Sequence, residues 1–331
     1  GVGGGSGGDE SSDDEDGDGL GGGGAVPLPP PPPPLVELLD SLDEMERHLS
    51  AQRILREYNL LQRMGSFREG EMGLDAERGQ SLLKAIARHV GRRSPRAPDH
   101  DWLQTRKDMV LFSRQGCGQL PSELPYREWL KALLRSAEFR LASDFLRTSR
   151  DLEVEIAQPL VLEAAREYLN SAPTPEDAAV DRAQQCLRVM PQVGLQDDLA
   201  EEMRAELDLI EAVRLLAAMG CALLPLQIRL HPDRLRLLTE LIETNPSPAQ
   251  HLASFELLAD VLRLRSTANK SASGSDKNRV QQAVARRALV CGEVACALQL
   301  TRRLVAAGHP PAWELCADFL GGETAGAAGA A

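Results

Sequence analysis

The chain has 331 residues, of which 43% are hydrophobic, 26% are charged and only 4% are aromatic. Leu and Ala dominate the hydrophobic set and favour helices, whereas the residues typical of strands are sparse, so the composition indicates an all-α fold. The net charge of −12 lacks the basic excess of a nucleic-acid-binding domain. Six scattered cysteines without CxxC spacing indicate a reducing compartment.

Residues 1–34 form a low-complexity segment that is first Gly-rich, then acidic, and then a run of prolines. Seven acidic residues and no Lys or Arg lie between Asp9 and Asp18, so the rest of the chain is only mildly acidic. Because this composition cannot bury a core, we expect the segment to be disordered. The prolines suit a stiff spacer or a ligand for a proline-recognition module, and Ser11 and Ser12 suit an acid-directed kinase.

From Leu35 onward, hydrophobic residues recur at the spacing of a helix. The first stripe contains Leu35, Leu38, Leu39, Leu42, Met45 and Leu49, followed by Ile54, Leu55 and Leu61. Further periodic segments, separated by short polar or proline-bearing joints, cover about 75–91, 100–113, 122–135, 137–148, 155–170, 176–190, 197–219, 224–230, 232–244, 248–264, 278–291, 293–307 and 311–320. No run of alternating β-branched residues competes with them.

Several of the predicted helix boundaries carry capping residues. Ser122 and Glu123 predict the start of one helix. We expect Thr174 to cap another helix, with Pro175 at its first position. The segment 245–248 should end one helix and start the next, and the segment 308–311 should end the penultimate helix.

These elements predict an α-solenoid of irregular helix hairpins over residues 35–321. A single hairpin cannot bury its apolar stripe, whereas a stack of neighbouring hairpins can. A globular helical bundle is the alternative. The Ser-, Asn- and Gly-rich stretch at about 266–276 predicts an internal loop, and residues 322–331 predict a flexible tail. The longest apolar run, 215–226, is far shorter than the ~20 residues of a membrane span, so we expect no direct transmembrane insertion.

The longest helical phrase, residues 205–238, contains no obvious chemistry and is broken by Pro225 and again near Pro232. One stripe at helical spacing precedes the first break and consists of Leu199, Met203, Leu207, Ile210, Val213 and Leu216. A second stripe follows and consists of Leu235, Leu238, Leu241 and Ile242. We expect both stripes to pack against adjacent helices.

The residues that usually carry catalysis or bind metal are scattered. None of the six histidines has another histidine four residues away, as a helical metal pair requires, and His231 is expected at a helix start. Cys291 and Cys296 should lie on different faces of a helix. Glu163 and Glu167 are one turn apart but indicate a solvated face. The sequence therefore predicts no enzyme, and no catalytic, cofactor-binding or metal-binding residue.

Short basic segments offer a different function. The sequence GRRSPR spans 91–96, and further Arg pairs occur at 286–287 and 302–303. These segments could contact RNA or phosphate, although no aromatic residues are interleaved with them as base stacking requires. An RNA-surveillance adaptor using 88–96 or 286–303 therefore stands as the alternative to a protein-binding scaffold.

Three ordered blocks resemble the Sec-thirty-nine domain family. They are AREYLNS within 160–190, ELDLIEA from Glu206, and LPLQIRLHPDR from Leu224. The stretch VAAGHPPAWELCADFLG at 305–321 is similar to the family's continuation. The resemblance covers about 36–321 and is strongest over 160–264. Residues 1–34 depart from the family pattern, and the family's amino-terminal β-propeller is not seen in this sequence.

The resemblance implies an α-solenoid subunit of a Dsl-type tethering complex. Such a protein is cytoplasmic and peripheral on the endoplasmic reticulum membrane. It docks other tether subunits and an ER SNARE in retrograde transport from the Golgi. Animal members of the family are also linked to nonsense-mediated mRNA decay, so mRNA-decay factors are possible partners. The family has no catalytic motif and implies no cofactor. The partner-binding residues are unknown from sequence.

Overall fold

The computed structural model describes residues 33–62, 75–117, 120–190, 197–221, 223–262, 273–317 and 319, and every regular element in these ranges is a helix. Its two compact units are residues 1–46 and 47–331. The fold is therefore all-α, as predicted. The predictions for 1–32, 266–272 and 322–331 lie outside the described residues.

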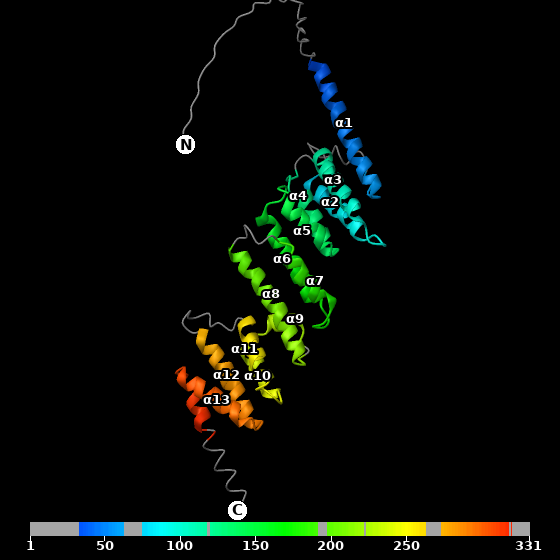
Figure 1. Ribbon diagram of the computed structural model, residues 1–331. Helices are drawn as coiled ribbons and strands as arrows, with labels where there is room; N and C mark the ends of the chain where they lie inside the picture. Colours follow the sequence, from blue (N-terminus) through cyan, green and yellow to red (C-terminus); the bar gives the residue numbers. More distant parts are fainter. Residues whose placement is uncertain are drawn as a thin grey trace, which may run out of the picture. The chain divides into compact units, whose positions relative to one another are not determined.

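The helices of the second unit follow one another along the chain (Figure 1). Helix α1 (Pro33–Glu57) begins in the first unit and ends in the second. The others are α2 (Ala76–Gly91), α3 (Asp99–Gly116), α4 (Leu124–Arg135), α5 (Phe139–Thr148), α6 (Val154–Ser171), α7 (Ala178–Leu187), α8 (Asp197–Ala218), α9 (Pro225–Leu230), α10 (Arg234–Thr244), α11 (Leu252–Val261), α12 (Ser273–Val290) and α13 (Val294–Ala306). Residues 312–317 are also helical.

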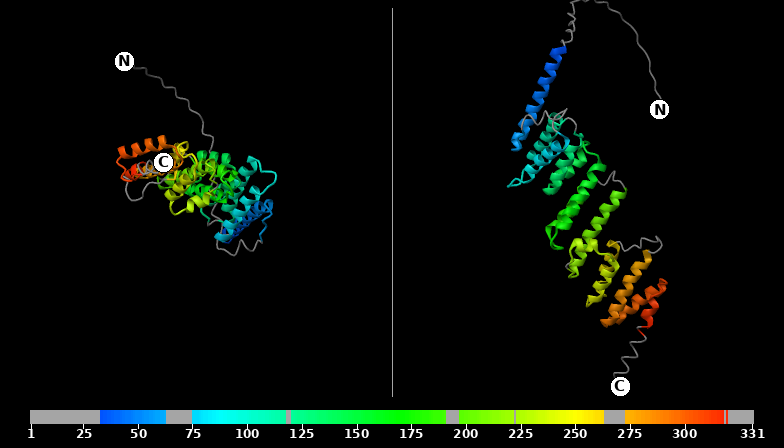
Figure 2. Two further views of the ribbon diagram at one scale, coloured as in Figure 1. Left: turned by 90° about the horizontal axis from the view of Figure 1, so that it is seen from below. Right: turned by 180° about the vertical axis from the view of Figure 1, so that it is seen from behind.

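Packing in the second unit is local in sequence. Helix α4 packs on α2, α3, α5 and α6; α6 packs on α7 and α8; α8 packs on α9 and α11; and α12 packs on α10, α11 and α13. Figure 2 shows the same succession from two further sides. Among the described helices, extensive packing joins only elements within three places of one another. This pattern is solenoid-like and not that of a closed bundle.

Large side chains fill the part of this stack between α3 and α5. Trp102 and Trp129 are both almost fully buried. The indole N–H of Trp129 donates to the carbonyl of Trp102 at 2.9 Å, so its polar atom is satisfied inside the core. The edge of the Trp129 ring meets Phe145 of α5, with the ring centres 5.0 Å apart. Three large aromatic side chains from three different helices therefore pack together in this part of the core.

The stripe predicted on α8 is confirmed. Ile210, Val213 and Leu216 are at most 1% exposed, Met203 is buried, and Leu199 and Leu207 are half-buried. Leu238 and Ile242 of α10 are fully buried as well, with Leu235 and Leu241 beside them. Both stripes therefore form core contacts, as the helical spacing indicated.

The chain leaves α8 earlier than the break expected at Pro225. Helix α8 ends at Ala218, and Gly220 has a φ of 79°. This left-handed backbone favours glycine, so a glycine turn ends the helix before the proline is reached. Gly308, with a φ of 67°, follows the end of α13 in the same way, which confirms the predicted stop at 308–311.

Several predicted boundaries are wrong by a few residues. Helix α7 begins at Ala178, and its cap is Asp177, which accepts a hydrogen bond from the Ala179 N–H at 2.7 Å. The backbone carbonyl of Thr174 instead accepts a hydrogen bond from the Asp177 N–H, in a turn that precedes the helix. The predicted Thr174 cap fails because Asp is an equally good capping residue placed nearer the apolar run.

Three other boundaries also move. Ser122 lies before the observed cap of α4, which is Glu123, and α11 starts at Leu252 after a turn over 248–251. The loop expected to reach residue 276 ends sooner, because α12 starts at Ser273, and Ser and Asp residues suit a first helical turn. Similarly, Pro33 and Pro34 belong to α1 and not to the segment expected to be disordered, since proline is tolerated in a first turn.

The hydrophobic residues predicted on α1 differ in how exposed they are. Leu38, Leu42 and Leu49 are 68%, 57% and 61% exposed, whereas Ile54 and Leu55 are at most 6% exposed. The helical period was predicted correctly. However, the spacing did not indicate which residues of the stripe are buried, and Leu61, the last of them, is 64% exposed.

Candidate functional site

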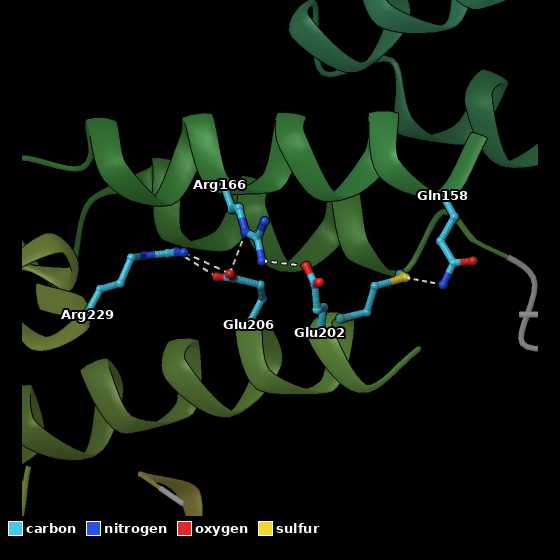
Figure 3. Close-up of polar contacts among 6 residues, drawn as sticks. Gln158, Arg166, Glu202, Glu206 and Arg229 are labelled. Atoms are coloured by element: carbon cyan, nitrogen blue, oxygen red, sulfur yellow. Dashed lines mark hydrogen bonds and ion pairs between the residues drawn. The ribbon is translucent and has the colours of Figure 1, made fainter. Parts of the chain in front are cut away.

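The strongest polar cluster in the second unit joins α6, α8 and α9, and we call it the Glu206 junction (Figure 3). Arg166 of α6 donates from Nε to Glu206 Oε1 at 2.7 Å and from Nη2 to Glu202 Oε2 at 2.9 Å. Arg229 of α9 donates from Nη1 and Nη2 to the two oxygens of Glu206 at 2.8 and 2.6 Å. Glu206 is only 5% exposed. One buried carboxylate thus holds three helices together.

The geometry of this junction is that of a structural ion pair. Both Glu206 oxygens accept guanidinium donors, and the Arg229 pair is bidentate, which fixes its orientation. Burial lowers the pKa of Arg166, but the hydrogen bonds that it donates to Glu206 and Glu202, with their negative charges, outweigh burial, so its pKa lies above the ordinary value. Glu206 is therefore not available as a general base.

Gln158 extends the polar contacts between α6 and α8. Its side chain is fully buried, and Nε2 lies 3.8 Å from the sulfur of Met203 (Figure 3). Its Oε1 has no hydrogen-bond partner within the described residues. A weak sulfur contact and an unsatisfied oxygen do not form a reaction centre, so Gln158 serves the packing of α6 on α8.

The histidines and cysteines do not converge on a metal or catalytic site. In the ranges that the structure describes, no group of three His, Cys, Asp or Glu residues could hold a metal ion. The histidines are spread over different helices and joints: His48, His89, His100, His231, His251 and His309. His231 caps the end of α9, whereas a helix start was expected, because Pro232 separates it from α10. Burial lowers the pKa of His309.

The cysteines are free thiols. Burial raises the pKa of Cys117 and of Cys186 to about 12, so neither is a thiolate nucleophile at neutral pH. Cys291 lies in the turn after α12 and Cys296 on α13, so they do not share the one helix that was expected. Gly292, with a φ of 80°, breaks the helix between them.

The predicted carboxylate and basic segments lie on the surface. Glu163 and Glu167 are exposed on α6, and Glu167 pairs with Arg135 at 3.3 Å. Arg93 pairs with Asp101 at 2.7 Å. The solvated face predicted for the two glutamates is confirmed. Two of the three arginines in the GRRSPR segment form ion pairs within the chain, since Arg96 pairs with Glu138.

An apolar surface lies at α13 and the helical residues after it, and we call it the terminal groove. Its cavity of about 650 Å³ is lined mostly by apolar side chains, including Val294, Leu298, Val305 and Trp313. Trp313 is 66% exposed. Exposed aromatic and aliphatic side chains around a hollow are typical of a protein-docking surface. This surface is a better candidate for function than any cluster of titratable groups described above.

The sequence did not reveal the Glu206 junction. Its only signal was that Glu206 lies three residues after Met203 and four before Ile210, on the buried stripe of α8. A carboxylate on such a stripe demands a cationic partner. The partners Arg166 and Arg229 lie 40 and 23 residues away, and nothing in a single sequence pairs them with Glu206.

Helices that pack mainly on their neighbours along the chain define the class of solenoid-like all-α proteins. A comparison with known families places the chain more narrowly. The profile described as "Secretory pathway protein Sec39" matches residues 37–307. The chain belongs to this family, as the sequence blocks indicated.

Two relatives show what the chain is similar to. It is 27% identical over 303 residues to the human "NBAS subunit of NRZ tethering complex", which covers 86% of the chain. It is 28% identical over 277 residues to "MAG2-interacting protein 2" of Arabidopsis thaliana, which covers 83% of the chain. The chain spans only 12% and 11% of the lengths of these relatives.

Proposed function

We propose that this chain is a non-enzymatic scaffold in a tethering complex of the endoplasmic reticulum. In this role it docks other tether subunits and an ER SNARE during retrograde transport from the Golgi, and it is cytoplasmic and peripheral on the membrane. The observation that carries the proposal is the family match over 37–307, together with a human relative named as a subunit of a tethering complex.

The structure supports a scaffold in two ways. The Glu206 junction and the aromatic core hold consecutive helices in fixed register, which a docking platform requires. The terminal groove offers exposed apolar side chains that a partner helix can cover. Among the described residues, no helix is long and apolar enough to cross a bilayer.

The test is a pull-down from a detergent extract of ER-rich membranes and cytosol with the whole chain as bait. We expect recovery of tether subunits and an ER SNARE that persists at about 200 mM salt, since apolar docking is insensitive to salt compared with phosphate contacts. The variant Leu298→Asp/Trp313→Asp should lose at least one of these partners, because two charges enter the terminal groove.

The matched control is Leu226→Asp/Leu230→Asp, which places the same charges on exposed leucines of α9. It should recover the same partners as the unmodified chain. Recovery of mRNA-decay factors alone, lost on ribonuclease treatment, would contradict the tether proposal and favour the RNA-surveillance adaptor.

A further inference from the structure

A second hollow, which we call the basic groove, lies between α2 and α4 and has a volume of about 450 Å³. One side carries Lys84, Arg88 and Arg92, which are four residues apart along α2 and its carboxyl end. The other side carries Lys131 and Arg135, also four residues apart, on α4. Residues at this spacing share one helix face, so two rows of cations border the same hollow.

Most of this positive charge is not neutralised by the protein itself. Lys84, Arg88 and Arg92 make no ion pair with any described residue, whereas their neighbour Arg93 does. The carboxyl ends of α2 and α4 favour cations in their last turns, which accounts for Arg88, Arg92 and Arg135. It does not account for Lys84 and Lys131, which lie earlier in each helix. An anionic ligand would complete the charge balance.

One buried acceptor also lines the groove. Glu128 is only 5% exposed, and its Oε1 has no hydrogen-bond partner among the described residues. The nearest cation, Lys131, lies 3.6 Å from that oxygen, which is too long for a hydrogen bond. A buried carboxylate oxygen without a donor is costly, so a ligand N–H placed there would be favourable. The ligand thus carries a hydrogen-bond donor beside its negative charges.

The rest of the groove wall is made of small side chains and contains no aromatic residue. Ala87, Gly91 and Ala132 lie among its lining residues, and a Cβ added at Gly91 would stand 2.6 Å from Ser136 Oγ. The end of α2 therefore lies against the Ser136 hydroxyl at this point of the groove. No aromatic side chain lines the groove, so it lacks the stacking surface that single-stranded nucleic acid requires.

We propose that the basic groove binds an acidic peptide segment of a partner protein. Peptide carboxylates pair with Lys84, Arg88 and Arg92, and a peptide backbone N–H donates to Glu128. Guanidinium groups match carboxylates in geometry as well as charge, which suits the two arginines. This inference goes beyond the tether proposal, because it assigns a ligand chemistry and holds whichever complex the chain joins.

The experiment is a fluorescence-anisotropy titration of the whole chain with a fluorescein-labelled peptide of about ten Asp and Glu residues. The chain's own acidic run is neutralised by Asn and Gln substitutions over 9–18, so that it cannot compete with the probe. We expect saturable binding at about 50 mM salt that weakens several-fold at about 200 mM, as ionic contacts do.

Two double variants locate the binding. Arg88→Glu/Arg92→Glu should weaken binding at least tenfold, or about 1.4 kcal/mol. Both arginines are exposed, so the fold should tolerate the change. Arg147→Glu/Arg182→Glu makes the same change in net charge at exposed arginines of α5 and α7 and should stay within about twofold of the parent.

Three results would overturn the proposal. The first is no saturable binding at low salt, and the second is an equal loss in both double variants. The third is displacement of the peptide by inositol hexakisphosphate or oligouridylate RNA at concentrations at least tenfold below those of unlabelled peptide. That last result would assign the groove to phosphate ligands instead.

Discussion

At the Glu206 junction two guanidinium groups bind one buried carboxylate, whereas in the basic groove five cations line the same hollow as one buried carboxylate. The junction places its donors within 2.9 Å of acceptors, and both Glu206 oxygens are occupied. In the groove, Glu128 Oε1 is unsatisfied and three cations lack a described partner. The same residue types therefore stabilise the fold where their charges balance, and we propose that they bind a ligand where their charges remain unbalanced.

The comparison predicts its largest effect at the junction. Glu206→Ala leaves Arg166 and Arg229 partly buried without their shared carboxylate. Removing one partner of a fully buried pair costs about 3–5 kcal/mol. Because Arg166 is 39% exposed and keeps Glu202, the urea-unfolding free energy should fall by less, about 2–3 kcal/mol. Glu201→Ala is the control, because Glu201 is exposed and pairs with Arg204 on the same helix. Its cost should stay below about 1 kcal/mol. Equal costs for the two variants would remove the distinction between buried and exposed charge.

The second prediction concerns pH. Burial raises the pKa of Cys186 from 9.0 to about 12, so the folded chain holds the thiol neutral while the unfolded chain ionises. Its contribution to stability is therefore complete below about pH 9 and is lost as the pH rises toward 12. When the pH rises from about 8 to about 10.5, the unfolding free energy of the unmodified chain should fall by about 2 kcal/mol more than that of the Cys186→Ala variant.

Denaturant titrations of both proteins at each pH measure this difference. A packing loss in Cys186→Ala appears equally at every pH, so only the pH dependence reports on the thiol. Parallel stability curves for the two proteins would rule out the expected titration.

A smaller effect is expected where a neutral donor meets a carboxylate. The hydroxyl of Tyr58 donates to Asp108 Oδ2 at 2.7 Å, while Gln104 donates to the other oxygen at 2.8 Å. Tyr58→Phe should lower the unfolding free energy by about 1–2 kcal/mol, because Asp108 keeps one of its two hydrogen-bond donors. Thermal unfolding followed by circular dichroism measures it. A loss as large as that of Glu206→Ala would show that ion pairing is not what distinguishes the junction.

The smallest stability effect is expected in the basic groove. Arg88→Glu/Arg92→Glu removes no described ion pair and relieves repulsion among neighbouring cations. The variant also places two anions at the carboxyl end of α2, where the helix favours cations. These opposing effects should keep the unfolding free energy within about 1 kcal/mol of the parent. A loss of several kcal/mol would show that the groove, like the junction, is part of the structure.

The helices could be predicted from the sequence because burial imposes a local period. The α8 stripe is correct because its spacing alone decides which face is buried. The capping residue is harder to predict from sequence. Thr174 and Asp177 lie three residues apart and either could cap α7, and only the geometry of the turn shows that Asp177 does. The domain limit was not apparent either, since the α1 leucines have the same period whether covered or exposed.

The sites were the least predictable. The GRRSPR segment identified Arg92 as a basic residue but did not separate it from Arg93, which pairs with Asp101. Lys131 and Arg135 belong to another helix, and only packing brings them opposite α2. Single-sequence reasoning finds charges but cannot tell which of them the fold has already neutralised.

Gly91 allows the form of the basic groove to be altered without touching its charge. A methyl group at this position would meet the Ser136 hydroxyl at 2.6 Å, whereas the Ser136 Cβ lies 4.0 Å away. Gly91→Ala would therefore turn the Ser136 hydroxyl away and add a methyl group to the groove wall without changing a single charge. Shape and charge, which most substitutions alter together, can therefore be tuned independently here.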